Sequence, residues 1–308
     1  MTHRIPLSIL LVGVSVMASL VQAQDKSTYY TVMHPKEFVI QWKAFYDRAD
    51  ELTAAARKVL PHELNIAYGS HPKQRLDVYQ PPSKPGGAPV FVFLHGGGFR
   101  EGDRAHYGFV ARPLADRGIV TVVASYRLLP DFHYPDQPED VRQTLAWVFG
   151  NIKRYGGDAN AIYVGGHSAG AILSATVSVK TDWQQRLALP RDVIKGCAPI
   201  SAPYDLTQEK GVTDYILEPA RRVEASPVRQ VENPPAQCLV AVGSDEPYGP
   251  SSQELVDKIR EKGKKAELLV LQGMDHAETA LALGDPQGKL VQALLAMMRP
   301  QSSASLPQ

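Results

Sequence analysis

Short apolar runs alternate with longer segments in which apolar residues return every three or four positions. The runs predict buried strands, and they lie at 90–94, 119–125, 161–165, 193–200, 238–242 and 267–271. The segments between them predict helices, which lie at 107–117, 139–155, 252–262 and 286–298, with one more directly after residue 168. Two shorter alternating segments, 63–68 and 75–79, predict an antiparallel edge. Strands that alternate with helices predict an α/β fold, with a mostly parallel sheet and helices on both faces.

The beginning of the chain has the pattern of an export signal. His3 and Arg4 precede a mostly apolar run at 5–20, and Val21-Gln22-Ala23 offers the small-x-small pattern of a cleavage site. We therefore expect a signal peptide over 1–23, a secreted or periplasmic location, and no stable membrane span after cleavage. The alternative is an uncleaved anchor helix, although the run is short for a span of ~20 residues.

Three further regions complete the predicted organisation: an N-terminal helical cap segment at 24–62, one α/β domain at 63–299, and a disordered tail at 300–308. In the cap segment, Trp42, Phe45 and Tyr46 recur at helical spacing. Such an aromatic stripe either packs in the core or lines the mouth of a substrate site.

A polar, proline-containing segment at 203–235 interrupts the alternation of strands and helices. It lies between two predicted strands of the sheet. We expect it to cross over the active site as an excursion, because loops carried by a rigid sheet are where specificity usually resides.

Composition excludes several classes of function. The formal net charge of the 308-residue chain is +1, without a basic patch or tail, so we expect no nucleic-acid partner. The two cysteines, Cys197 and Cys238, are far apart in sequence, and no cluster of cysteine and histidine predicts a metal site. The cysteines lie on strands expected to be neighbours, which leaves both a disulfide and two buried thiols open.

The segment Gly166-His167-Ser168-Ala169-Gly170 joins a predicted strand to a predicted helix. Small residues on both sides of one hydroxyl permit the sharp turn of a nucleophile elbow, which exposes Ser168 Oγ to a substrate. The bare G-x-S-x-G pattern also occurs in ordinary turns, so other residues must support this interpretation. His167 is expected to point away from the substrate.

A serine nucleophile needs a general base and a carboxylate that orients the base. His276 follows the last predicted strand, and Asp245 follows the strand before it. Loops at one edge of a parallel sheet converge, and the chain order Ser168, Asp245, His276 is the order associated with a nucleophile elbow. Glu246 or Asp275 is the alternative acid; Asp245 would then be a turn residue, and His276 has the alternative of a surface loop residue.

The triple glycine Gly96-Gly97-Gly98 directly follows a predicted central strand. It allows backbone N–H groups to converge on one point, as an oxyanion hole requires. We assign the hole to the N–H groups of Gly97, Gly98 and Ala169. A phosphate-binding loop is excluded because neither the Lys-Ser/Thr pair nor the G-x-G-x-x-G spacing follows, and no cofactor is expected.

Two charged residues follow the next predicted strand, at 119–125. Arg127 and Asp140 are predicted to pair and to brace the glycine loop. The alternative is an ordinary charged turn.

Together these motifs resemble the α/β-hydrolases, in particular the hormone-sensitive-lipase-like esterases with the related arylformamidases and feruloyl-esterase-like enzymes. The matching motifs, in the family's order, are 95–99 (HGGGF), 125–130 (SYRLLP), 166–170 (GHSAG), 243–245 (GSD) and 275–276 (DH). The resemblance covers roughly 66–298. It implies an eight-stranded sheet and an oxyanion hole at Gly97, Gly98 and Ala169. Two features depart from it: arylformamidases usually carry an aromatic residue where Gly98 stands, and the segment before residue 60 is short for an esterase cap.

The resulting prediction is a serine carboxylesterase that hydrolyses small carboxylic esters, aromatic esters included, through Ser168, His276 and Asp245. Its partner is then a small-molecule ester. The alternative in the same class is an arylformamidase-type amide hydrolase acting on N-formyl aromatic amines. A hydrolase-like binding protein without catalysis is the alternative in another class.

Overall fold

The computed structural model describes residues 30–34, 37–83 and 86–299. The expected signal peptide at 1–23 and the expected tail at 300–308 lie outside these residues. Within the described ranges, no helix combines the length and the apolar character that a membrane span requires.

The core of the molecule is an eight-stranded sheet with the order β10-β9-β8-β7-β5-β6-β4-β3. Neighbouring strands are parallel except where β4 pairs with β3 and with β6. The strands are β3 (His62–Ala67), β4 (Arg75–Tyr79), β5 (Ala88–Leu94), β6 (Val120–Ala124), β7 (Gly157–His167), β8 (Ile194–Ile200), β9 (Gln237–Gly243) and β10 (Lys265–Leu271). This confirms the predicted α/β class, the antiparallel edge and the number of strands.

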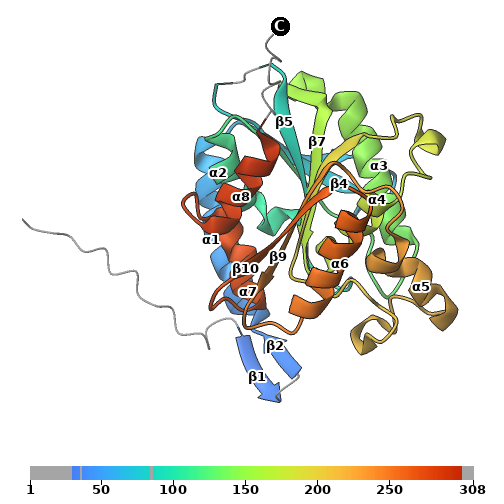
Figure 1. The fold of residues 1–308 in the computed structure, drawn as a ribbon. Helices are drawn as coiled ribbons and strands as arrows, with labels where there is room; N and C mark the ends of the chain where they lie inside the picture. Colours follow the sequence, from blue (N-terminus) through green and yellow to red (C-terminus); the bar gives the residue numbers. More distant parts are fainter. Residues whose placement is uncertain (1–29, 35–36, 84–85, 300–308) are drawn as a thin grey trace, which may run out of the picture.

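Helices cover both faces of this sheet (Figure 1). They are α1 (Trp42–Val59), α2 (Ala111–Ala115), α3 (Asp136–Asn151), α4 (Ala169–Val179), α5 (Arg222–Ala225), α6 (Gly249–Glu261), α7 (His276–Leu281) and α8 (Lys289–Met298). The alternating side chains of β5 divide between two apolar cores. Val90 and Val92 belong to the core shared with α3, α4 and α6, whereas Phe91 and Phe93 belong to the core shared with α1, α2 and α8.

The structure differs from the sequence prediction in two elements. The helix expected over 107–117 is reduced to the five residues of α2, which two short 3₁₀ turns precede. In the segment expected to be a helical cap, α1 begins only at Trp42, and β1 (Tyr30–His34) and β2 (Glu37–Ile40) form a separate antiparallel pair. Both strands are rich in β-branched and aromatic residues, which favour extended backbone.

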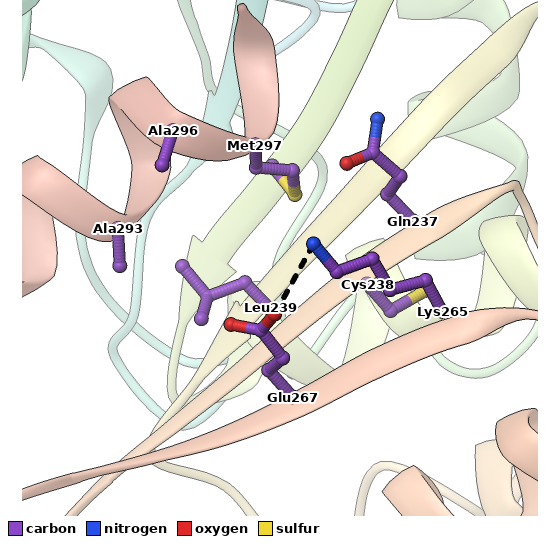
Figure 2. Close-up of a pocket in the computed structure, with 8 residues that line it drawn as sticks. All are labelled: Gln237, Cys238, Leu239, Lys265, Glu267, Ala293, Ala296 and Met297. Carbon is purple, nitrogen blue, oxygen red and sulfur yellow. Dashed lines mark ion pairs between the residues drawn. The ribbon is translucent and has the colours of Figure 1, made fainter. Parts of the chain in front are cut away.

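Cys197 and Cys238 lie opposite each other in the register of β8 and β9, and both are buried free thiols. A hydrogen bond with Cys238, together with burial, raises the pKa of the Cys197 thiol well above its usual value. Cys238 also lines a small cavity of about 90 Å³ between α8 and the strands β9 and β10 (Figure 2). Gln237 and Lys265, which begin these strands, line it too. The cavity therefore lies at the edge of the sheet opposite the carboxyl ends of the strands.

Candidate active site

Ser168 lies between the last residue of β7 and the first residue of α4, with a positive φ of 55°. This backbone strain is typical of residues held in place for function. The flanking glycines allow the close approach that the turn needs. A Cβ on Gly170 would overlap the carbonyl oxygens of Leu94 and His95, and a Cβ on Gly166 would overlap the carbonyl oxygen of Gly170. The sequence 166–170 therefore forms the strand–turn–helix of a nucleophile elbow.

The structure brings His276 to this serine. His276 Nε2 lies 2.9 Å from Ser168 Oγ, within hydrogen-bond distance, and the His276 side chain is buried. His276 is the first residue of α7, which Asp275 caps: Asp275 Oδ1 accepts from the N–H groups of Ala277 and Glu278. The Glu278 side chain in turn accepts from the Asp275 N–H. This reciprocal capping box fixes the start of the helix and hence the position of the histidine.

The carboxylate on the other side of the His276 ring is that of Glu246. Glu246 Oε1 lies 3.7 Å from His276 Nδ1, and the Glu246 side chain is fully buried. The distance exceeds that of a hydrogen bond, but catalytic hydrogen bonds are often long before substrate binds. Asp245, which we expected in this place, is exposed, and Ser244 Oγ donates to its Oδ1 at 3.0 Å. We therefore take Glu246, the alternative considered from the sequence, as the candidate acid in place of Asp245.

The turn after β9 accounts for the inward position of the Glu246 side chain. The Asp245 N–H donates to the carbonyl of Met274, and the Glu246 N–H donates to that of Gly243. With the backbone held in this way, the side chain of residue 246 enters the protein while that of residue 245 faces the surface. Asp275, the other alternative, serves as the cap of α7, and burial raises the pKa of its carboxyl.

The glycine loop lies directly against the elbow. A Cβ on Gly96 would stand 3.2 Å from Ser168 Cβ. Gly97 and Gly98 have φ values of 120° and 59°, which favour glycine, and a Cβ on Gly97 would overlap the carbonyl oxygen of Glu101. Ala169 is the first residue of α4, so its N–H has no acceptor within the helix. Gly96 thus lies beside the nucleophile, and the assignment of the oxyanion hole to Gly97, Gly98 and Ala169 stays a prediction.

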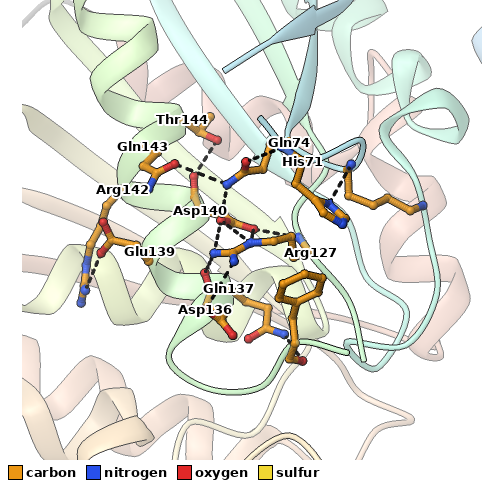
Figure 3. A network of polar contacts seen from close by, with 12 residues as sticks. His71, Gln74, Arg127, Asp136, Gln137, Glu139, Asp140, Arg142, Gln143 and Thr144 are labelled. Carbon is orange, nitrogen blue, oxygen red and sulfur yellow. Dashed lines mark hydrogen bonds and ion pairs between the residues drawn. The ribbon is translucent and has the colours of Figure 1, made fainter. Parts of the chain in front are cut away.

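The ion pair between Arg127 and Asp140 lies next to the glycine loop and is connected to it by a hydrogen bond. Asp140 is fully buried and accepts from the Arg127 side chain at 2.7 Å, from the Arg127 N–H at 2.8 Å and from Gln74 Nε2 at 2.8 Å. In Figure 3, the side chains of Arg127 and Gln74 converge on the Asp140 carboxylate. The Leu129 N–H, two residues after Arg127, donates to the carbonyl of Phe99 at 2.8 Å. The predicted pairing is present, and this bond connects it to the end of the glycine loop.

The excursion at 203–235 is docked on the same loop. Tyr215 stacks on Phe99 with ring centroids 3.7 Å apart and an interplanar angle of 5°. Asp214 forms an ion pair with Arg100, and the Tyr134 N–H donates to the carbonyl of Tyr215 at 2.9 Å. The excursion therefore contacts the residues that directly follow Gly98, as a segment that contributes to specificity would.

A polar cavity of about 480 Å³ adjoins the segment after the glycine loop. Its walls combine charged groups of both signs, including Lys73 and Asp103, with the aromatic rings of Tyr46 and Phe132. Phe45 instead is buried in the core. One ring of the aromatic stripe of α1 thus packs in the core and another lines a cavity, and a role at the mouth of the substrate site stays a prediction. In the described part of the chain, no group of three or more His, Cys, Asp or Glu side chains is placed to hold a metal ion.

Two buried histidines make the fold sensitive to acid. Burial lowers the pKa of His95 to about 4, and burial together with nearby His276 lowers the pKa of His167 well below its usual 6.5. Each histidine takes up a proton in the unfolded chain at a pH where the folded protein does not. The stability they contribute is complete above pH 6.5 and is lost as the pH falls, with a slope of about 1.4 kcal/mol per pH unit for each histidine.

We therefore expect the melting temperature to fall between pH 6.5 and pH 4, and His167→Gln to make this fall shallower than in the wild type. His62→Gln at the surface is the matched control and should leave the slope unchanged. Calorimetry across this range measures both. Equal slopes for wild type and His167→Gln would contradict the prediction.

Comparison with known proteins shows the family of the chain. A profile of the α/β-hydrolase fold matches residues 91–280. Kynurenine formamidase of Salmo salar is 31% identical over 80% of this chain and 86% of its own, and that of Danio rerio is 30% identical over 80% and 85%. Among solved structures, an esterase of Pyrobaculum calidifontis has a TM-score of 0.69 and 22% identity, covering 83% of this chain and 91% of its own. The chain belongs to the α/β-hydrolase family, in its hormone-sensitive-lipase-like branch.

Proposed function

We propose that the protein is a serine hydrolase that cleaves small carboxylic esters through an acyl-enzyme. The observation that carries this proposal is the 2.9 Å contact between His276 Nε2 and Ser168 Oγ at a strained elbow. The buried carboxylate of Glu246 lies on the far side of the same ring. Nucleophile, base and acid are thus aligned in the order that activates a hydroxyl at neutral pH.

The reaction follows from these positions. His276 Nε2 accepts the proton of Ser168 as Oγ bonds to the acyl carbon, and the resulting oxyanion accepts hydrogen bonds from the N–H groups of Gly97, Gly98 and Ala169. When the tetrahedral intermediate collapses, His276 returns this proton to the departing alcohol. His276 then takes a proton from water as the water oxygen bonds to the acyl carbon. When this second intermediate collapses, the bond to Ser168 Oγ breaks, His276 returns the proton to Oγ, and the carboxylic acid is released. Throughout, the Glu246 carboxylate takes no part in the proton transfers and holds the imidazole in orientation.

The space at Gly98 favours esters with an acyl group larger than formyl. A Cβ built on Gly98 would meet no atom within 4 Å, so the glycine loop leaves open space at this residue, which we take as room for the acyl group. A formamide needs little such room, because its acyl group carries only a hydrogen. We therefore propose acetyl and longer acyl esters as the substrates.

Cleavage of N-formyl aromatic amines is the second candidate. It is favoured by the similarity to two fish proteins named kynurenine formamidase, which extends over 80% of the chain. The two candidates share the nucleophile and the base and differ in the acyl group and in the leaving atom, which is oxygen in an ester and nitrogen in a formamide.

Purified protein assayed on phenyl acetate, phenyl butyrate and N-formylkynurenine separates the candidates. We expect kcat/KM for the better phenyl ester to exceed that for the formamide at least tenfold; the reverse order would replace the ester proposal with the formamidase. A fluorophosphonate, followed by mass spectrometry of the labelled peptide, tests the shared mechanism. Absence of label on Ser168 would contradict both candidates and support a binding protein without catalysis.

A further inference from the structure

Thr279 lies at the centre of a buried group of polar atoms behind the candidate triad. Its side chain is fully buried on α7, one turn after His276. Four polar atoms surround Thr279 Oγ1: Ser201 Oγ at 2.8 Å, the His276 carbonyl oxygen at 2.9 Å, Glu246 Oε1 at 3.2 Å and His167 Nε2 at 3.3 Å. A hydroxyl has one hydrogen to donate, so only some of these contacts are donations by Thr279.

The protonation of the His167 ring excludes its Nε2 as an acceptor for the hydroxyl hydrogen of Thr279. His167 is buried and uncharged, because burial lowers its pKa well below the usual value. Its Nε2 lies 2.8 Å from the carbonyl oxygen of His276, which can only accept a hydrogen bond. Nε2 therefore carries the hydrogen of the neutral ring and cannot accept one from Thr279.

Ser201 supplies a hydrogen rather than receiving one, since Ser201 Oγ donates to Thr279 Oγ1. Two acceptors then remain for the hydroxyl hydrogen of Thr279. The carbonyl of His276 already accepts from His167, whereas Glu246 Oε1 belongs to a buried carboxylate. A hydrogen bond to a charged acceptor is roughly twice as strong as one between neutral groups, so the hydrogen favours Glu246.

The hydrogen bond from Thr279 is important because the Glu246 carboxylate accepts few other hydrogen bonds. Glu246 Oε2 is buried and makes no hydrogen bond within the described part of the chain. A buried carboxylate that loses a donor is free to turn away or to take up a proton, and either change removes its support of the imidazole. The orientation of the acid thus depends on a hydroxyl outside the triad.

We propose that Thr279 is a positioning residue that orients Glu246 toward His276, with its hydroxyl receiving a hydrogen bond from Ser201 and donating one to the carboxylate. The inference rests on the proposed function, since it concerns the acid of that same site. Thr279 touches neither the substrate nor the reacting atoms and acts through Glu246. His167 contributes by holding the carbonyl of His276, which would otherwise compete for the same hydrogen.

Thr279→Val keeps the shape of the side chain and removes the hydroxyl. We expect kcat on the better phenyl ester to fall 10- to 100-fold with KM changed less than twofold, and Thr279→Ser to restore kcat to within threefold of the wild type. Thr176→Val is the matched control, because it makes the same change on α4, where the hydroxyl donates to the carbonyl of Ile172; its kcat should fall less than threefold. If valine prevents folding, the smaller Thr279→Ala takes its place.

The decisive measurement repeats the substitution in a Glu246→Gln background. If Thr279 acts through the carboxylate, Thr279→Val changes kcat there by less than twofold. An equal loss in both backgrounds, or no loss in the wild-type background, would overturn the proposal. Failure of the proposed function itself has a different signature, because fluorophosphonate would then leave Ser168 unlabelled in the wild-type protein.

Discussion

Ser168→Ala is expected to lower kcat/KM for small esters by about 10⁶, to the background that binding and the oxyanion hole supply. The effect is this large because the hydroxyl is the atom that bonds to the acyl carbon, and no neighbouring group takes its place. Folding should be unaffected: alanine and serine both have a Cβ and therefore experience similar strain at the φ of 55° observed here. Hydrolysis of phenyl acetate over several hours, with a detection limit below the predicted residual rate, measures the loss.

Ser174→Ala is the matched control for this substitution. Ser174 is buried on the same helix and donates to the carbonyl of Ala171, away from the candidate base. It should retain activity within a few-fold of the wild type. Activity of the Ser168 variant comparable to that of the Ser174 variant would exclude Ser168 as the nucleophile.

Glu246→Gln is expected to lower kcat by about 10³ to 10⁴, the order found when the carboxylate of a serine triad becomes an amide. Glutamine preserves the size of the side chain but removes the charge that stabilises the imidazolium. It also presents an amide that can favour the wrong tautomer of His276. Initial rates at saturating ester, with circular dichroism to verify the fold, measure the effect.

The chain offers its own control in the adjacent residue. Asp245→Asn makes the same chemical change one position earlier, on an exposed side chain, and should change kcat less than threefold. The comparison is direct because both residues follow β9 in one turn. A large loss in Asp245→Asn with little loss in Glu246→Gln would restore the acid expected from sequence.

The elbow and the glycine loop were predictable because their requirements are local. A strand that ends in small residues around one serine, and three glycines after a buried strand, are properties that the sequence shows directly. The structure adds the overlaps that a Cβ at Gly170 or Gly97 would create. The alternating apolar runs likewise predicted the parallel sheet, because buried strands and amphipathic helices have different periods.

The acid was not predictable in the same way. Asp245 and Glu246 are neighbours of the same charge, and the choice between them depends on the backbone of a short turn that is held by the carbonyls of Met274 and Gly243. Both side chains satisfy the pattern of a carboxylate after a strand. The stacking of Tyr215 on Phe99 was equally inaccessible, because 115 positions separate rings that only the folded excursion brings together. The sequence shows a proline-containing break in the alternation of strands and helices. This break predicted where the excursion at 203–235 lies, but not that Tyr215 contacts Phe99.

The capping box at the start of α7 has a consequence for how this site is dissected by mutagenesis. Three carboxylates, Asp275, Glu246 and Glu278, help to hold one imidazole, but two of them do so by fixing the first turn of a helix. Removing the cap moves the His276 ring, and removing Glu246 takes away its acid partner. Both changes lower activity, so an alanine scan gives similar defects for residues with different roles. Serine or asparagine at position 275 preserves the cap without the charge. Such replacements distinguish a residue that holds the backbone in place from one that stabilises charge during turnover.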